Sequence, residues 1–223
     1  MARRALRILI SAGPTREPLD PVRYLSNAST GVMGRELAAA ALQRGHRVTM
    51  VCGPGVVAMP PRATVVPVTE AREMGAALRR LAPHHDAILM AAAVADFRPA
   101  HRAASKLTRG RARMLRLVPV PDLIGTLPRH AGQVRIGFAL ETGPVVPRAG
   151  RKMTEKHLDA VLAQRIGRSG PFGAVPVEAW LLEAGAAGRR IRVRRMGRVT
   201  KSRIAGALLD KVEQLWYGRQ GRF

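Results

Sequence analysis

The chain has 223 residues, a length that fits one domain, and 47% of them are hydrophobic, which is enough for a sizeable core. Lys and Arg number 38 against 15 Asp and Glu, giving a formal net charge of +23 that favours an anionic partner. Aromatic residues make up only 4%, too few for the stacking platforms of single-stranded nucleic-acid binders. The lone cysteine, Cys52, excludes an internal disulfide and an all-cysteine metal site. No apolar run reaches the length of a membrane span, so we expect a soluble, cytoplasmic protein.

The first part of the chain alternates predicted strands with a predicted helix. An apolar run at residues 7–12 predicts a strand buried on both faces. The spacing of apolar residues at 32–44 predicts a helix that Gly45 ends, and 46–52 predicts the second strand of a βαβ unit. Because a βαβ unit joins parallel strands, this order predicts a parallel sheet.

The remaining elements continue the alternation. A short strand at 63–68 precedes a helix that Thr69 caps and Pro83 ends, and a buried strand follows at 87–92. The C-terminal part predicts a strand, a strand with one solvated face and a final helix, at residues 177–182, 189–196 and 204–215. We therefore expect an α/β, Rossmann-like three-layer fold with a mostly parallel central sheet, as a single domain over residues 1–223.

The loop between the first strand and the first helix, residues 11–34, is chemically dense. It reads SAGPTREPLDPVRYLSNASTGVMG, and its apolar residues Val22, Tyr24 and Leu25 favour an ordered loop. A loop of this length inside a compact unit is usually functional or disordered. It leads into a helix N-terminus, where free backbone N–H groups attract anions, so it predicts a ligand site. The alternative is a Gly- and Pro-rich connection with solvated charges.

A second dense stretch, MAAAVADFRP at residues 90–99, begins at the end of the strand predicted at 87–92. Its small residues let a ligand approach the backbone, and Asp96 is placed where an acceptor could hold a ribose, a base or a metal-bound phosphate. The alternative is that Asp96 caps a turn and pairs with Arg98. The segment 98–116 carries seven Lys or Arg and no acid, which is typical of a solvated segment or of a lid over an anion.

Together these stretches resemble phosphopantothenoylcysteine synthetase, also called phosphopantothenate–cysteine ligase, an enzyme of coenzyme A biosynthesis often fused behind a flavin-dependent decarboxylase. The match is to the synthetase half only and covers roughly residues 7–215. It rests on six blocks in the family's order, at residues 12–34, 91–99 (AAAVADFRP), 104–107 (ASKL), 121–124 (PDLI), 137–142 (GFALET) and 152–159 (Lys-x-x-x-Lys-x-x-Asp).

The resemblance implies a ligation in two steps. The carboxylate of 4′-phosphopantothenate attacks the α-phosphate of CTP, and the amine of cysteine then displaces CMP from the acyl-cytidylate. It also implies Mg²⁺ as a cofactor and a homodimer in which a lid reaches the neighbour's site. A separate flavin-dependent decarboxylase is an open partner, and nucleic acid is disfavoured because no nucleic-acid module surrounds the Arg-rich run at 189–203.

The resemblance also implies a set of site residues, with no metal ligand assigned among them. The implied catalytic residues are Asn27, Arg23 and Lys106. The implied nucleotide-binding residues are Met90, Ala91, Ala92, Asp96, Lys106, Pro121, Asp122, Leu123, Ile124, Phe138, Lys152 and Lys156. The implied substrate-binding residues are Gly13, Thr15, Arg23, Asn27 and Ala92.

The chain departs from the family's pattern at several positions. Val32 stands where the pattern Ser-Ser-Gly-Lys-Met-Gly has lysine, Gln164 stands where it has asparagine, and the Gly-rich segment 169–176 lacks the usual Ser-Asp-x-Asn ending. These departures leave open a pseudoenzyme that binds the nucleotide without ligase activity.

Two further classes of protein fit the residues less well. A Rossmann-type reductase is disfavoured because Cys52-Gly53-Pro54 replaces the acidic residue that would hold a ribose. A basic nucleic-acid-binding protein fits the net charge but does not account for the dense loop at residues 11–34.

Overall fold

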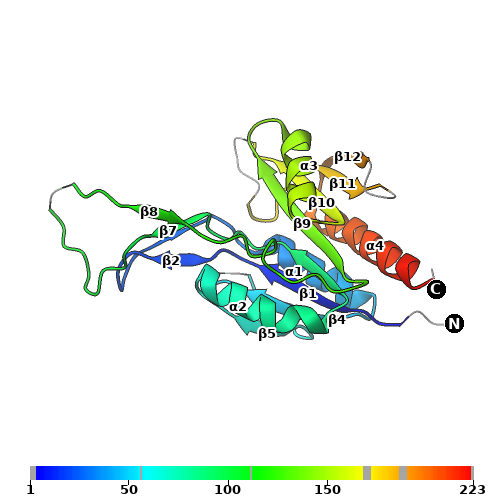
Figure 1. The fold of residues 1–223 in the computed structure, drawn as a ribbon, viewed down its shortest axis with the longest axis horizontal. Helices are drawn as coiled ribbons and strands as arrows, with labels where there is room; N and C mark the ends of the chain where they lie inside the picture. The colour runs from blue at the N-terminus through cyan, green and yellow to red at the C-terminus, as the bar shows by residue number, and fades with distance from the viewer. Residues whose placement is uncertain (1–3, 56, 111, 168–171, 186–189, 222–223) are drawn as a thin grey trace.

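The computed structural model describes residues 4–55, 57–110, 112–167, 172–185 and 190–221. Its centre is an eight-stranded sheet in the order β12-β11-β10-β9-β6-β1-β4-β5 (Figure 1). The strands are β1 (Arg7–Ala12), β4 (Arg47–Cys52), β5 (Thr64–Pro67), β6 (Ala87–Met90), β9 (Val134–Glu141), β10 (Ala160–Arg165), β11 (Val177–Ala184) and β12 (Ile191–Val199). The first six of these are parallel, and β11 and β12 add antiparallel pairs at one edge, so the predicted mostly parallel sheet is confirmed.

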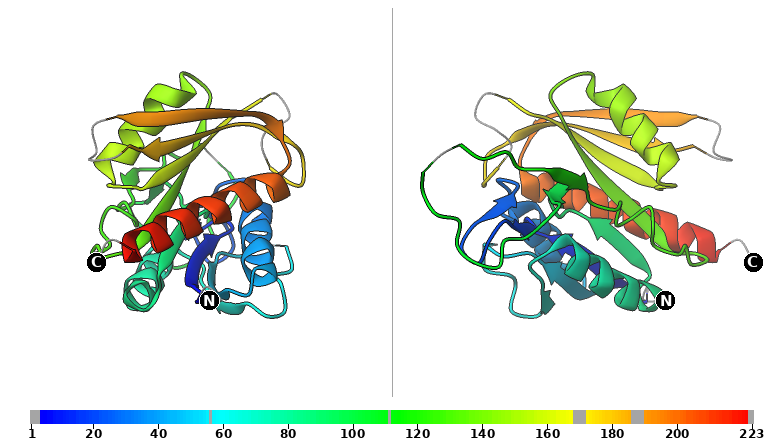
Figure 2. Two further views of the ribbon diagram at one scale, coloured as in Figure 1. Left: turned by 90° about the vertical axis from the view of Figure 1, so that its right-hand side faces the viewer. Right: turned by 60° about the vertical axis from the view of Figure 1, so that its left-hand side comes forward.

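Helices cover both faces of this sheet and make it the middle of three layers. α1 (Val32–Gln43) and α4 (Lys201–Gln220) pack on one face, whereas α2 (Ala71–Leu81) and α3 (Val145–Glu155) pack on the other. Figure 2 shows α3 and α4 on opposite sides of the sheet. Among the described helices, none is long and apolar enough to cross a membrane.

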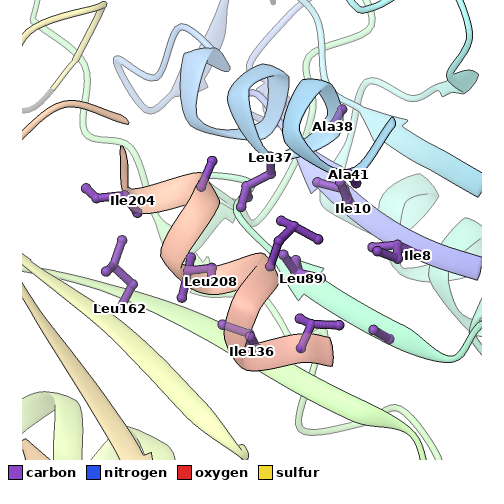
Figure 3. Close-up of a cluster of buried hydrophobic side chains, with 14 of the residues drawn as sticks. Ile8, Ile10, Leu37, Ala38, Ala41, Leu89, Ile136, Leu162, Ile204 and Leu208 are labelled. Atoms are coloured by element: carbon purple, nitrogen blue, oxygen red, sulfur yellow. The ribbon is translucent and has the colours of Figure 1, made fainter. Parts of the chain in front are cut away.

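The alternation of side chains along β1 explains why both faces are covered. Ile8 and Ile10 pack under α1 and α4, whereas Leu9 points to the face that carries α2. Leu37 from α1 and Leu208 from α4 meet over this part of the sheet (Figure 3). All five side chains are fully buried, so the α/β three-layer fold is confirmed.

Two small antiparallel pairs project from the carboxyl edge of the sheet as an arm (Figure 1). β2 (Arg16–Pro18) pairs with β3 (Tyr24–Ser26), and β7 (Phe97–Pro99) pairs with β8 (Leu117–Pro119). We call residues 16–26 and 97–119 together the arm. Most of the segment 98–116, predicted as a lid, forms the long connection between β7 and β8, and position 111 lies outside the described residues.

Several element boundaries differ from the prediction. β1 has its predicted bounds, and Gly45 adopts a positive φ of 81° after α1, as expected of a helix end. Thr69 does not cap α2; Glu70 is the N-cap and forms a capping box with Glu73. β6 ends at Met90, two residues before the predicted end, because the chain leaves the sheet there to line a cavity.

The strand predicted at 189–196 is β12, and its apolar face is only partly covered. Ile191 and Val193 are 38% and 46% exposed, because β12 is the last strand of the sheet and α3 borders them only across a groove, where Ile191 lies against Gly150. Residues 186–189, which include the predicted start of this strand, lie outside the described residues. Cys52 is buried in the core, and burial raises the pKa of its thiol to about 11, so this cysteine contributes packing.

Candidate functional site

The site lies where the order of strands reverses. β1 leads through α1 to β4 on one side of it, whereas β6 pairs with its other side and leads on toward β9. The loops that leave the carboxyl ends of β1 and β6 therefore diverge and open a crevice, the usual ligand site of such sheets.

The two loops are joined at their base by Gly13 and Thr15. The Ala93 amide donates to the carbonyl of Gly13 at 2.9 Å, and the Thr15 amide donates to the carbonyl of Ala93 at 3.3 Å. The Thr15 hydroxyl, fully buried, accepts from the Ala95 amide at 3.0 Å. Neither Gly13 nor Thr15 is among the described residues of the cavity lining, so in this chain both hold the loops together.

A glycine allows this junction to form. A Cβ at Gly53, which follows β4, would lie 1.7 Å from the carbonyl oxygen of Pro14. Any other residue at position 53 would push the loop after β1 away from β4. Close packing therefore explains the glycine in Cys52-Gly53-Pro54, the place where a reductase would carry an acidic residue.

A cavity of about 580 Å³ opens beside this junction. It brings together twelve of the predicted site residues, namely Asn27, Met90, Ala91, Ala92, Asp96, Pro121, Asp122, Leu123, Ile124, Phe138, Lys152 and Lys156. These residues come from the loops after β1 and β6, from β9, from α3 and from the segment before β9. Residues that are far apart in the sequence thus meet at one site.

Asn27 bridges the two loops at the cavity wall. Its Nδ2 donates to the carbonyls of Ala93 and Val94, at 3.1 and 3.0 Å. The residue is nevertheless exposed and lines the cavity. Asn27 therefore fixes the loop after β6 and lies next to any ligand that the cavity holds.

Lys152 and Lys156 place two cations on the α3 side of the cavity. The Nζ of Lys152 donates to the carbonyl of Phe138 at 2.6 Å, and Lys156 pairs with Asp122 at 2.9 Å. Burial and the charge of Lys156 lower the pKa of Lys152, while Asp122, Glu141 and Asp96 raise it, and the net pKa is below its ordinary value. A buried cation of this kind is stabilised by an incoming anion.

Two carboxylates, Asp96 and Asp122, also line the cavity. Asp96 is exposed and forms no ion pair with Arg98 within the described residues, so the alternative in which those two pair is not seen. No group of three or more His, Cys, Asp or Glu side chains in the described chain is arranged to hold a metal ion. Mg²⁺ often uses one or two carboxylates together with substrate phosphates, so this pair fits a metal that enters with a nucleotide.

The N-terminus of α1 forms another part of the wall. Gly31 is its N-cap, in the left-handed region at φ 78°, and no side chain caps the helix. A Cβ at Gly34 would lie 2.4 Å from the Cβ of Ala12, so this glycine lets α1 pack closely on β1. The first residues of α1 line the cavity, and no side chain of the described residues caps their amides, which suits an anion.

Arg23 and Lys106 lie on the arm and not in the cavity lining. Arg23 pairs with Asp20 at 2.7 Å and donates to the carbonyl of Leu107, and the Leu107 amide donates to Asp20 at 3.1 Å. Burial raises the pKa of Asp20, but hydrogen bonds from Val22, Leu107 and Arg23 outweigh it and the net pKa is lowered. Arg23 thus ties the two halves of the arm together, and Lys106, next in the chain to this link, is exposed.

Lys201, the first residue of α4, also lines the cavity, although the sequence motifs do not mark it. It belongs to the Arg-rich run 189–203, which was interpreted as solvated, yet it is only 7% exposed. Thr200, whose hydroxyl accepts from the Arg203 amide, is a recognisable N-cap and was the available signal that α4 begins there. Gln164 and Phe172 were not predicted as site residues either, and both line the cavity. Of the segment 169–176, positions 169–171 lie outside the described residues.

Fold and cavity together define an α/β protein with a lysine-bearing cavity at the carboxyl edge of a mostly parallel sheet. The family described as DNA/pantothenate metabolism flavoprotein C-terminal domain matches residues 4–215. The chain belongs to this family. The resemblance to phosphopantothenoylcysteine synthetase predicted from the motifs is thereby confirmed.

Individual relatives and solved structures agree with this assignment. The chain is 42% identical over 170 residues to the coenzyme A biosynthesis bifunctional protein CoaBC of Escherichia coli (strain K12), covering 73% of this chain and 42% of that protein. The CoaBC of Mycobacterium bovis is 35% identical over 194 residues, covering 79% and 46%. A crystal structure of the C-terminal domain of CoaBC matches with a TM-score of 0.79 and 29% identity, covering 96% of this chain and 97% of that one. The chain spans less than half the length of these two relatives.

Proposed function

We propose that the chain is a CTP-dependent phosphopantothenate–cysteine ligase of coenzyme A biosynthesis. The observation that carries the proposal is the single cavity that joins Phe138, Lys152 and Lys156 with Asn27 at the divergence of β1 and β6. An acid and a nucleotide must meet there with their reacting atoms side by side, and both are anions. Nearby cations offset that repulsion and lower the barrier to attack on the α-phosphate.

The residues of the α3 side suit a nucleotide. Phe138 offers an aromatic ring to a base or a ribose, and Asp96 offers a hydrogen-bond acceptor. Lys152 and Lys156 supply positive charge for phosphate oxygens. Asp122 would hold Mg²⁺, which supplies charge neutralisation to the phosphates when it is bound.

Asn27 suits the second step, in which the amine of cysteine attacks the acyl carbon. Its side-chain amide lies at the cavity wall and donates hydrogen bonds to two backbone carbonyls. A small shift would let one N–H donate to the acyl oxygen, where a neutral donor stabilises the developing negative charge without acting as a base. The small residues Ala91 and Ala92 leave room for the acyl chain beside it.

Arg23 and Lys106 enter the proposal through a second copy of the chain. Both lie on the arm, which projects from the carboxyl edge of the sheet (Figure 1). Several apolar side chains of the arm are exposed, namely Val22, Tyr24, Phe97, Met114, Leu115 and Leu117. A homodimer in which the arm covers the partner's cavity would bury these side chains and bring Lys106 to the nucleotide. A flavin-dependent decarboxylase remains a proposed partner, since the relatives are bifunctional and about twice as long.

Pyrophosphate release tests the proposal directly. Purified protein with Mg²⁺ should release pyrophosphate only when 4′-phosphopantothenate is present, faster with CTP than with ATP, and should complete turnover only with cysteine. Nucleotide binding without pyrophosphate release under any condition would contradict the ligase.

That contrary outcome would favour the second candidate, a pseudoenzyme that binds the nucleotide. Its supporting observation is the buried Val32 at the start of α1, which contributes no charge to the cavity wall where the family's pattern has lysine. Without that cation, binding on the α3 side would persist while the phosphates lose a contact near α1.

A further inference from the structure

We infer that Lys201 is the phosphate-binding cation of the α1 side of the cavity, where it contacts the β- and γ-phosphates of the nucleotide. The inference rests on the proposed nucleotide site and extends it to a residue that the motifs do not mark. Lys152 lies in α3 and Lys156 directly follows that helix, on one face of the sheet, whereas Lys201 begins α4, on the other face. All three line one cavity, so a triphosphate that passes over the sheet edge meets cations at both ends.

The side chain of Lys201 is held at the cavity by a short chain of hydrogen bonds. Its Nζ donates to the carbonyl of Gly173, and the Gly173 amide donates to the hydroxyl of Thr30 at 3.2 Å. The peptide group of Gly173 thus connects α4 to the loop before α1. Phe172, Thr30 and Lys201 all contribute to the lining. Lys201 therefore stands beside the helix N-terminus that Gly31 opens.

The groups on this side of the cavity favour an anion. The lining contributed by residues 27–33, 164, 166, 172 and 201 contains no carboxylate, in contrast to the α3 side with Asp96 and Asp122. The uncapped amides of α1 and the ammonium of Lys201 are donors only. Such a set matches the oxygen-rich end of a triphosphate better than it matches a base or an acyl chain.

The electrostatics of Lys201 agree with this assignment. Burial lowers the pKa of its ammonium, and the charge of Glu36, on α1, offsets part of that effect. An anion stabilises a desolvated ammonium more than the carbonyl of Gly173 does, because two opposite charges in close contact attract each other more strongly than a charge attracts a carbonyl dipole. We therefore expect the Nζ to move from the carbonyl to a phosphate when the nucleotide binds.

Calorimetry with CTP, CMP and inorganic pyrophosphate tests the inference without requiring turnover. Lys201→Met should weaken the binding of CTP and of pyrophosphate at least tenfold and leave CMP within twofold, because CMP lacks the β- and γ-phosphates. Lys201→Arg should keep most of the affinity. The matched control is Lys211→Met, on the same helix, since Lys211 pairs with Glu183 and is not in the lining; all three affinities should stay unchanged.

Three outcomes would overturn the inference. Equal weakening of CTP and CMP would show that Lys201 only supports the fold around Gly173, and thermal melting of each variant would reveal that loss. Unchanged CTP binding would show that no phosphate contacts Lys201. If the unsubstituted chain bound neither CTP nor pyrophosphate, the inference would fail together with the nucleotide site, whereas binding without pyrophosphate release would overturn only the ligase.

Discussion

The cavity and the arm carry predicted site residues in very different surroundings. Lys152 in the cavity is half-buried and is held against the Phe138 carbonyl, whereas Lys106 on the arm is exposed. Strand ends and the helices packed on the sheet fix the cavity residues, but only the arm's own hairpins fix Lys106. The difference indicates that one chain positions its cavity residues by its own packing, while the arm leaves Lys106 and its apolar side chains exposed, where another surface could contact them.

The largest effect is expected from removing the buried cation of the cavity. Lys152→Met should lower the rate of pyrophosphate release by roughly 10³-fold, about 4 kcal/mol of transition-state stabilisation. The melting temperature should not fall, because a desolvated ammonium contributes little to the stability of the free protein. Arg151→Met, one residue earlier and exposed on α3, is the matched control and should keep normal activity. A normal rate for Lys152→Met would remove the α3 side from the nucleotide site.

A substitution of Asn27 tests the opposite side of the cavity, because we expect it to slow only the second step, the attack of cysteine. Asn27→Asp removes the donor and sets a carboxylate near the acyl group, so the attack of cysteine should slow by roughly 10²- to 10³-fold. Pyrophosphate should still appear in a single burst, and 4′-phosphopantothenoyl-cytidylate should accumulate in the mass spectrum even with cysteine present. If Asn27 only ties the loop to Ala93 and Val94, both steps should decline together and no intermediate should build up.

A substitution of Lys106 tests whether the arm contributes to the site in the cavity. Lys106→Gln should lower the first step by about 10²-fold, on the scale of roughly 3 kcal/mol, with the fold intact because the side chain is exposed. If the arm serves the partner's cavity, mixing Lys106→Gln with Lys152→Met should restore activity to roughly a quarter, since mixed dimers contain one intact site. The rate of pyrophosphate release before and after mixing decides this. A mixture no more active than its two components would place Lys106 outside the partner's site.

The sequence predicted the elements whose signals are local. The apolar run of β1 and the Gly45 end of α1 depend on neighbouring residues, and both were found where the pattern put them. Lys201 was missed because its burial comes from α4 packing beside α1 and from Gly173, which are not adjacent in the sequence. Gly13 and Thr15 stay predicted substrate-binding residues, and their hydrogen bonds to the Ala93 region, about 80 residues away along the chain, have no local signal in the sequence.

Exposed apolar side chains show a related limit of sequence analysis. The alternation in 189–196 correctly indicated a strand, but whether its apolar face is covered depends on the strand's place in the sheet. β12 is an edge strand, so Ile191 and Val193 stay exposed. The pattern of a strand therefore predicts which residues share a face and leaves open what that face contacts.

The smallest effect on activity, and a measurable one on stability, is expected where the cavity wall meets the sheet. Gly34→Ala places a methyl group 2.4 Å from the Cβ of Ala12, and neither group has a flexible end that could move away. α1 must shift off β1, at a cost of about 1–3 kcal/mol that exceeds the roughly 1 kcal/mol gained in helix propensity. Chemical denaturation should show the net loss, and the KM for CTP should rise a few-fold because the N-terminus of α1 moves with the helix.

Gly206→Ala is the matched control for this change. Gly206 also lies in a helix, α4, and a Cβ there would meet nothing within 4 Å. The same substitution should therefore stabilise the chain by up to about 1 kcal/mol, with the KM for CTP unchanged. A Gly34→Ala variant as stable as Gly206→Ala would show that α1 tolerates the displacement. The close packing of α1 on β1 would then not be what holds the helix N-terminus at the cavity.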